Sequence, residues 1–244
     1  MEHWESLRPG GLRFVWDDDL FHPGTDTFLL SSLPRLKPGL RVCDLGSGTG
    51  LLGLLLLQRQ MGLSVTGVEL QPEAVRLAER AAAENSLTDR LTFRRGDLRE
   101  IRSLLPAGAF DLAVCNPPYY PPGAGGLPRQ SELQTARAET FCTLGDVCSA
   151  AAWLLRWGGG FCLVHKPERL TDLLCTLRSA GLEPKRLRMV CRQAGSPPSL
   201  VLLEARRGGR PGLELPPPLL LQAPDGSPTD ELDAIYFRQK EDGP

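Results

Sequence analysis

The chain has 244 residues, of which 41% are hydrophobic and 23% charged, and its formal net charge is −1. This composition is that of a globular protein, and the length suffices for one large or two small domains with a substantial core. No apolar run reaches the roughly 18 residues that span a bilayer, and the first residues lack the pattern of a secretory signal peptide, so we expect a cytoplasmic protein without a membrane segment.

The seven cysteines indicate the same compartment. Cys43, Cys115, Cys162 and Cys191 lie within apolar, strand-like runs, and the chain has no Cys-x-x-Cys pair. An odd number of scattered cysteines predicts buried free thiols of a cytosolic protein. It does not favour a disulfide framework or a metal site.

The chain begins with a short N-terminal part, residues 1–39. Two apolar runs flank Asp17-Asp18-Asp19, which predicts a hairpin turn there. A polar loop then leads into Phe28-Leu29-Leu30, and Thr25 or Asp26 is placed to cap a helix over that run.

From residue 40 onward, strand-like and helix-like segments alternate, which predicts a Rossmann-like α/β sheet with helices on both faces. The seven strand candidates are Arg41–Asp44, Ser64–Glu69, Leu91–Arg95, Asp111–Cys115, Gly160–Val164, Leu187–Cys191 and Leu200–Glu204. The helix candidates are Leu51–Gln60, Pro72–Asn85, Ala136–Trp157 and Pro167–Ala180, with an ill-defined turn at Leu98–Leu105.

The sheet is expected to be mostly parallel with an antiparallel last strand. The final two strand candidates are joined only by Gln193–Ser199, which is too short for a parallel crossover. We expect one domain over residues 40–207, followed by a C-terminal extension over 208–244.

The glycine-rich turn after the first of these strands is the strongest single signal. Asp44 is followed by Gly46, Gly48 and Gly50 and then by an apolar helix. Such a turn brings backbone N–H groups close to a ligand, and its spacing also fits a dinucleotide fingerprint. A carboxylate at Asp44 would repel a pyrophosphate, however, and attract the ammonium and sulfonium of S-adenosylmethionine. The alternative is that Asp44 only caps the next turn.

Two further acidic residues follow the next strands. Glu69 is placed to accept both hydroxyls of a ribose, and Asp97 to accept from an adenine amino group. Leu70 and Leu98 would then sandwich the adenine ring. Taken singly, each acid is more often an ordinary loop residue, but three acids at the carboxyl ends of successive strands converge on the ligand crevice of such a sheet.

The fourth strand candidate ends in Asn116-Pro117-Pro118-Tyr119. The prolines fix the backbone and remove N–H donors, leaving the Asn116 side-chain oxygen and the Pro117 carbonyl as rigid acceptors beside an aromatic ring. This array suits a planar substrate with an amino group, stacked on Tyr119. Its nitrogen would attack the methyl group directly, with no metal and no protein nucleophile, so catalysis would be mainly positioning.

Together these motifs, over residues 40 to 165, resemble class I S-adenosylmethionine-dependent methyltransferases that act on amino groups. The chain is most similar to the bacterial tRNA adenine-N6 methyltransferase family that acts at position 37 of valine tRNA. The resemblance implies that Asp44 and the glycines hold the methionine portion of the cofactor, that Glu69 binds ribose and Asp97 adenine, and that residues 116–119 bind the target base in the anticodon loop.

Two more elements of that family are present. A Thr-Asp-x-x-Leu-Leu element precedes the glycine turn, here Thr25-Asp26-Thr-Phe-Leu-Leu30, so Thr25 and Asp26 are implied to lie at the cofactor. An Arg-x-Glu element follows the Asn-Pro-Pro-Tyr loop, here Arg137-Ala-Glu139. Between the Asn-Pro-Pro-Tyr loop and this Arg-x-Glu element, the Gly-rich stretch 121–126 suggests a loop that closes over substrate.

Other functions stay open. The Asn-Pro-Pro-Tyr array also serves enzymes that methylate a glutamine amide in peptide release factors, although only about 39 residues stand where those enzymes have a long helical domain. A ribosomal RNA or a small molecule is also a conceivable substrate. A non-catalytic RNA-binding module on a methyltransferase fold is the third reading, and the intact Asp44 and Asn116 argue against it.

Charge is unevenly distributed. Residues 166–210 carry ten basic and four acidic residues, a net of +6, whereas residues 211–244 carry a net of −5. Lys166, Arg186 and Arg188 are therefore candidates to hold RNA phosphates, and His165 is a candidate to touch substrate. The alternatives are solvated arginines and a surface histidine. No protein partner is evident.

Overall fold

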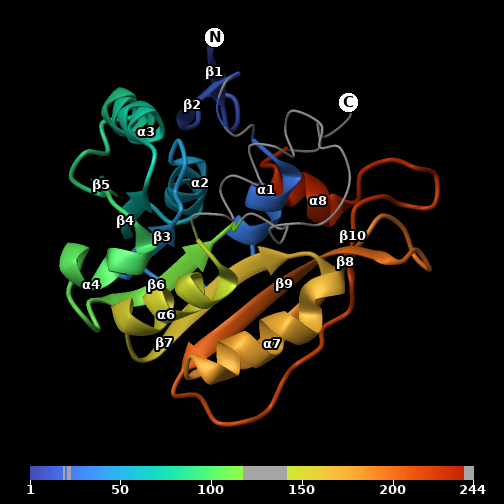
Figure 1. Ribbon diagram of the computed structural model, residues 1–244. Helices are drawn as coiled ribbons and strands as arrows, with labels where there is room; N and C mark the ends of the chain where they lie inside the picture. Colours follow the sequence, from blue (N-terminus) through green and yellow to red (C-terminus); the bar gives the residue numbers. More distant parts are fainter. Residues whose placement is uncertain (19, 21–22, 118–141, 239–244) are drawn as a thin grey trace, which may run out of the picture.

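The computed structural model describes residues 1–18, 20, 23–117 and 142–238, and its centre is an eight-stranded sheet in the order β10-β8-β9-β7-β6-β3-β4-β5 (Figure 1). The strands are β3 (Arg41–Leu45), β4 (Ser64–Glu69), β5 (Leu91–Arg95), β6 (Phe110–Cys115), β7 (Leu155–His165), β8 (Leu182–Cys191), β9 (Pro198–Arg207) and β10 (Leu219–Leu220). The strands from β3 to β7 are parallel, and β9 is antiparallel to both of its neighbours.

This topology confirms the Rossmann-like sheet and the antiparallel strand late in the chain. The predicted strand count of seven is wrong, because β10 adds an eighth strand, parallel to β8 at the sheet edge. Its pairing covers only Leu219 and Leu220, which follow Pro216-Pro217-Pro218. A two-residue strand after three prolines leaves no periodic pattern to detect.

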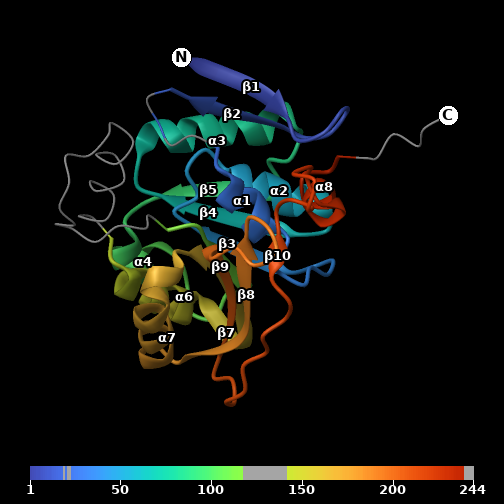
Figure 2. The same cartoon turned by 90° about the vertical axis from the view of Figure 1, so that its right-hand side faces the viewer.

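Helices cover both faces of the sheet (Figures 1 and 2). One face carries α1 (Thr25–Ser31), α2 (Leu51–Arg59), α3 (Pro72–Glu84) and α8 (Asp230–Ile235), and the other carries α4 (Ile101–Leu104), α6 (Leu144–Leu154) and α7 (Leu170–Ser179), with short 3-10 turns η1 (Leu98–Glu100) and η2 (Pro167–Arg169). Each face has its own hydrophobic cluster. Successive strand residues alternate between the clusters: Val42 packs into the first and Cys43 into the second.

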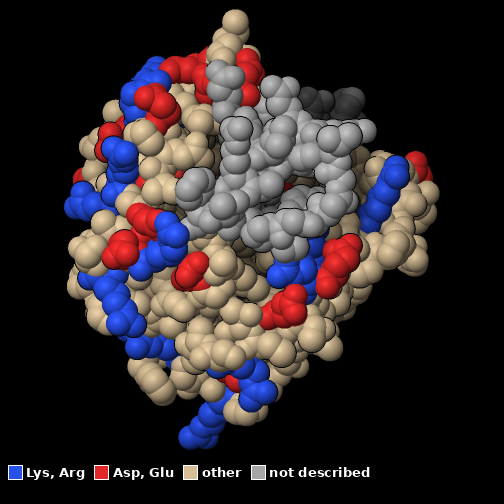
Figure 3. Space-filling view, viewed as in Figure 1, with Lys and Arg blue, Asp and Glu red and all other residues tan. Residues whose placement is uncertain are grey.

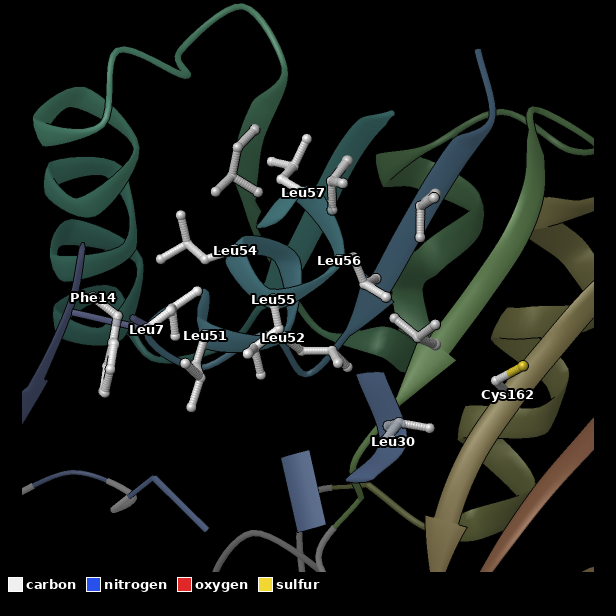
Figure 4. Close-up of a cluster of buried hydrophobic side chains, with 14 of the residues drawn as sticks. Leu7, Phe14, Leu30, Leu51, Leu52, Leu54, Leu55, Leu56, Leu57 and Cys162 are labelled. Atoms are coloured by element: carbon white, nitrogen blue, oxygen red, sulfur yellow. The ribbon is translucent and has the colours of Figure 1, made fainter. Parts of the chain in front are cut away.

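The helix that follows the glycine turn is apolar on every side. All residues from Leu51 to Leu57 are buried, because α2 lies between the sheet and the N-terminal elements (Figure 4). Leu7 and Phe14 of the hairpin and Leu30 of α1 contact the same cluster. A helix enclosed in this way needs no polar face, which explains its continuous leucine run.

The N-terminal hairpin differs from the prediction. It pairs β1 (Glu2–Ser6) with β2 (Arg13–Asp17), so the acidic run predicted as its turn lies where β2 ends. The predicted cap of α1 is also wrong, because Gly24 is the N-cap and no side chain caps the helix. Thr25 is already the first helical residue, so its hydroxyl is past the position from which it would accept the free N–H groups.

The predicted helix over Ala136–Trp157 also needs correction. Among the described residues, α6 begins at Leu144 and ends at Leu154, and residues 155–157 start β7, where Leu155 pairs with Phe110. The run Leu154-Leu155-Arg156-Trp157 fits the residue pattern of a helix as well as that of a strand. Only its pairing with β6 shows that the strand begins at Leu155. Within the described residues, no helix is long and apolar enough to cross a membrane.

The packing of α2 predicts a large cost for truncating it. Leu55 is fully buried, so Leu55→Ala should lower the free energy of unfolding by about 2–5 kcal/mol through lost transfer energy and a residual cavity. Met61→Ala, at a side chain that is 46% exposed, is the matched control and should change it by less than about 0.5 kcal/mol. Urea unfolding followed by circular dichroism measures both, and equal effects would contradict the central place of α2.

Candidate active site

The glycine turn joins β3 to α2 as predicted. Gly48 and Gly50 both have positive φ, 53° and 82°. A Cβ at Gly50 would also lie 2.8 Å from the Phe93 ring, so two independent constraints favour glycine there. The backbone N–H of Gly48 points at β4 and donates to Glu69 Oε2 over 2.9 Å.

Asp44 lies beneath this turn and is almost fully buried, with 2% of its surface exposed. The backbone N–H of Gly53, in the first turn of α2, faces its carboxylate and partly offsets the rise of its pKa. Its Oδ2 atom is buried and has no hydrogen-bond partner among the described residues. Burial and the nearby Glu69 raise the pKa of Asp44 to about 8. The N-cap of α2 is Gly50, so a capping role of Asp44 stays a prediction, and its Oδ2 atom is available to a cation.

Glu69 connects the glycine turn to the next loop. Its Oε2 accepts from Gly48 and its Oε1 accepts from the backbone N–H of Gln71, both over 2.9 Å. The side chain is buried, whereas the following Leu70 is 41% exposed. Each carboxylate oxygen can accept a second hydrogen bond, so the predicted contact with ribose hydroxyls is compatible with this arrangement.

Asp97 stands apart from the pocket at Asp44. It caps η1 by accepting from the backbone N–H of Arg99 over 2.9 Å, and it also pairs with the Arg99 guanidinium. Hydrogen bonds from Arg99 lower the pKa of Asp97. Leu98, the first residue of η1, is partly buried. An adenine amino group would have to share Asp97 with Arg99, and the predicted role of both residues stays a prediction.

Asn116 directly follows β6 and lines the same pocket as Asp44, Gly46, Ser47 and Gly48. Its Nδ2 donates to Thr27 Oγ1 of α1 over 3.0 Å. Pro117 is buried. Pro118, Tyr119, the stretch 121–126 and the Arg137–Glu139 element lie outside the described residues.

Sequence reasoning gave no role to four polar residues that line this pocket: Thr27, Ser47, Thr49 and Gln71. Ser47 Oγ, like Asp44 Oδ2, is buried without a partner among the described residues. The predicted Thr25 and Asp26 are absent from the residues that line it, whereas Thr27 two positions later is present. The signal existed in the Thr-Asp-Thr sequence, but only the helix phase shows which of its side chains points inward.

The predicted RNA-contacting arginines already have acidic partners. Arg186 pairs with Glu204 over 2.9 Å and donates to the carbonyl of Leu33. Arg188 pairs with Glu231 of α8 through both terminal nitrogens. Basic and acidic side chains are interspersed over the visible face in Figure 3. The net charge of this segment therefore overstates the positive field that it offers to a phosphate.

His165 ends β7 and is buried, with 3% of its surface exposed, so the surface-histidine interpretation is wrong. Its Nδ1 accepts from the backbone N–H of the following Lys166 over 2.9 Å. Burial lowers the pKa of His165, which favours the neutral ring. A direct contact of His165 or Lys166 with substrate stays a prediction.

The sheet order, the glycine turn and a buried acid at the end of β3 are those of a Rossmann-like α/β enzyme, and solved methyltransferases share this fold. A predicted O-methyltransferase from Agrobacterium tumefaciens superposes with a TM-score of 0.70 at 21% identity, covering 87% of this chain and 96% of that one. Geranyl diphosphate C-methyltransferase from Streptomyces coelicolor, in complex with S-adenosyl-L-homocysteine, has a TM-score of 0.54 at 16% identity, covering 74% and 77%.

Sequence comparison gives the family. The model of the methyltransferase small domain family matches residues 14–169. Two relatives are named tRNA1(Val) (adenine(37)-N6)-methyltransferase. The one from Dickeya chrysanthemi is 32% identical over 214 residues, covering 85% of this chain and 83% of the relative. The one from Tolumonas auensis is 32% identical over 181 residues, covering 74% of each. The chain therefore belongs to the methyltransferase small domain family.

The cofactor is S-adenosylmethionine, and the residues present fit it. The unpartnered Oδ2 of Asp44 and the neighbouring Glu69 make a buried acidic site that favours a ligand carrying an ammonium and a sulfonium. The glycine turn leaves room beside them, because side chains on Gly46 and Gly48 would meet no other atom within 4 Å.

The pKa of Asp44 predicts a pH dependence of cofactor binding. Below about pH 8 the empty site holds a proton on Asp44, which a cationic ligand must displace. Affinity should therefore rise by up to about tenfold per pH unit between roughly pH 5.5 and 7.5, before the cofactor's own amino group deprotonates. Asp44→Asn should bind more weakly, with no such slope. Isothermal titration calorimetry measures this, and a flat wild-type profile would contradict it.

A stability measurement is the control. Because the pKa of Asp44 is raised to about 8 in the cofactor-free folded state, Asp44 keeps its proton above the ordinary aspartate pKa of 3.8, where the unfolded chain has lost it. Asp44 therefore lowers the free energy of unfolding progressively as the pH rises from about 4 to about 8, and Asp44→Asn should remove that loss.

Proposed function

We propose that this protein transfers the methyl group of S-adenosylmethionine to N6 of an adenine in RNA, namely adenine 37 in the anticodon loop of a valine tRNA. Relatives that carry this name align over as much as 85% of the chain. The observation that carries the proposal is that Asn116 and the buried Asp44, the acid proposed to face the cofactor, line the same pocket. A tRNA substrate also implies a cytoplasmic enzyme.

The chemistry needs an amino group held in one orientation. Because Thr27 accepts from the Asn116 nitrogen, the amide of Asn116 turns its oxygen away from α1. That oxygen and the Pro117 carbonyl can accept the two hydrogens of an adenine amino group, which directs the nitrogen lone pair toward the pocket. Tyr119 would stack on the ring.

The cofactor supplies a methyl group already activated on a sulfonium. The new N–C bond forms as the S–C bond breaks, and the nitrogen then loses a proton to water. The protein's contribution is positioning, which supplies up to about 7–11 kcal/mol of such barriers. An unpaired loop base is cheap to bring into the pocket, because it has no partner strand to leave. Since the methyl group is already electrophilic, no metal ion should be needed.

The substrate is tested with labelled S-adenosylmethionine and the anticodon stem-loop of valine tRNA, in the presence of a metal chelator. Label should enter the stem-loop but not a matched one with guanine at position 37, and nucleoside digestion should yield N6-methyladenosine. A peptide release factor is incubated in parallel. Label in the release factor alone would replace the proposal by glutamine methylation, and RNA binding without any label would favour the non-catalytic module.

Removal of the acceptor oxygen should stop catalysis without emptying the cofactor site. Asn116→Ala should reduce the rate of methyl transfer by at least about 100-fold, the usual effect of one preorganised polar group at a reacting centre. Calorimetric affinity for the cofactor should change little, because Asp44 and Glu69 are untouched. A rate within a few-fold of wild type would contradict the role of Asn116.

Thr27 should act through Asn116 as a positioning residue. Thr27→Val keeps the shape of the buried side chain but removes the acceptor, which frees the amide to rotate, so kcat should fall by about 10–100-fold with little change in KM. Thr27→Ser keeps a hydroxyl and should restore most of the rate. Equal rates for the valine and serine variants would show that only packing matters there.

A further inference from the structure

A groove that none of the functions above uses runs beside the candidate active site. Its walls come from three parts of the chain: the β1–β2 hairpin, the first turn of α1, and the residues that follow α8. Figure 2 shows the hairpin above α1 and α8. The residues that matter for its chemistry are Arg8, Trp16, Phe28, Tyr236, Phe237 and Arg238.

Partly exposed aromatic rings line the groove. Phe28 and Tyr236 stack with centroids 4.4 Å apart and an interplanar angle of 6°. Trp16 stacks on His3 at 4.2 Å. Of these residues, Trp16, Phe28 and Tyr236 line the groove together with Phe237, and all four are partly buried, so parts of their rings border the groove. Interleaved aromatic rings of this kind are the usual platform for unpaired bases, because every base has a stacking face.

Two exposed arginines stand on opposite walls. Arg8 lies on the hairpin, and no ion pair of its side chain occurs among the described residues. Arg238 lies 4.9 Å above the Tyr236 ring and is 3.4 Å from Asp233. One acidic residue, Glu5, also lines the groove, and its Oε1 accepts from the Trp16 indole over 2.8 Å. Among the described lining residues, the charge balance is therefore positive.

The aromatic wall is held rigidly. Arg59 of α2 donates to the carbonyl of Ile235 over 2.7 Å and lies 4.6 Å above the Phe237 ring. Phe237 has a positive φ of 56°, which is unfavourable for a bulky side chain. Such a conformation persists only where the surroundings enforce it, and it concentrates at binding sites. Both facts favour a preformed binding surface.

The groove also adjoins the active site. Pro23 lines both the groove and the pocket of Asp44 and Asn116. In the first turn of α1, Thr25 lines the groove whereas Thr27 lines the pocket. A strand of RNA with one base in the pocket would therefore have its neighbouring nucleotides at the mouth of the groove.

We propose that this groove binds the single-stranded nucleotides that flank the target adenine, with bases stacked on the aromatic wall and phosphates at Arg8 and Arg238. The inference rests on the proposed RNA substrate. It assigns the RNA contact to a surface other than the β8 arginines, which pair closely with Glu204 and Glu231 and are 21% and 23% exposed. Arg238 also has an acidic partner, Asp233, but its side chain is 56% exposed.

The charge arm of the test uses the anticodon stem-loop with a fluorescent label, and anisotropy at several salt concentrations. Arg8→Ala/Arg238→Ala should weaken binding at least about fivefold and reduce the slope of log affinity against log salt by about one to one and a half. Arg178→Ala/Arg206→Ala removes the same charge from exposed positions away from the groove and should leave both quantities unchanged. Cofactor affinity should be equal in all three proteins.

The stacking arm uses Tyr236. Tyr236→Leu removes the ring and should weaken RNA binding at least about fivefold, whereas Tyr236→Phe keeps the stacking face and should not. The Arg8→Ala/Arg238→Ala and Tyr236→Leu variants should each raise KM for the stem-loop and leave kcat nearly unchanged, because none of these side chains touches the reacting atoms. Thermal unfolding of each variant verifies that the fold is intact.

The wild-type protein separates the two hypotheses. If it neither binds nor methylates the stem-loop, the proposed function fails. If it methylates the stem-loop and the groove variants keep wild-type affinity, salt slope and KM, the groove inference is overturned, and the groove then serves another occupant. An equal loss in the Arg178→Ala/Arg206→Ala control would likewise overturn it, because the effect would be one of total charge.

Discussion

The site depends on one buried carboxylate. Asp44 keeps Oδ2 buried and unpartnered among the described residues, and burial together with the nearby charge of Glu69 raises the pKa of Asp44. A buried charge without a partner is costly, and a protein interior tolerates it only where something else compensates. Below about pH 8 a proton on Asp44 provides that compensation, and a cationic ligand could replace the proton. The glycine turn keeps side chains out of the space beside Asp44, and the first turn of α2 directs backbone N–H groups toward the same region. Both features therefore serve the surroundings of this acid.

Glu69 makes the arrangement stiff as well as acidic. Its two oxygens hold the backbone of Gly48 and of Gln71, so the turn after β3 and the turn after β4 are fixed to each other through one side chain. Both turns therefore keep their places before any ligand arrives. In a reaction that relies on positioning, a scaffold that does not have to reorganise contributes directly to the rate.

Sequence alone predicts the sheet, the glycine turn and the acids at the strand ends well, because these follow from hydrophobic periodicity and short-range turn chemistry. It fails where two distant segments decide. Leu155 could continue a helix until it pairs with Phe110, and β10 exists only because β8 offers an edge to it. The same limit hides Thr27, whose importance comes from Asn116, 89 positions away. It also hides the match between Arg188 and Glu231, which reduces the charge that the local sequence suggests.

The first turn of α1 unites the two halves of the proposed RNA site. Residues two apart on a helix point to opposite sides, so Thr27 faces Asn116 in the pocket while Thr25 faces the groove. No side chain caps this short helix, and its position comes instead from the buried Leu29 and Leu30 in the core around α2. The helix that holds the Asn116 amide thus also forms a wall of the groove. Nucleotides docked there would be held at a fixed distance from that amide by the hydrophobic core itself, so recognition of the strand and orientation of its adenine would have a common physical origin.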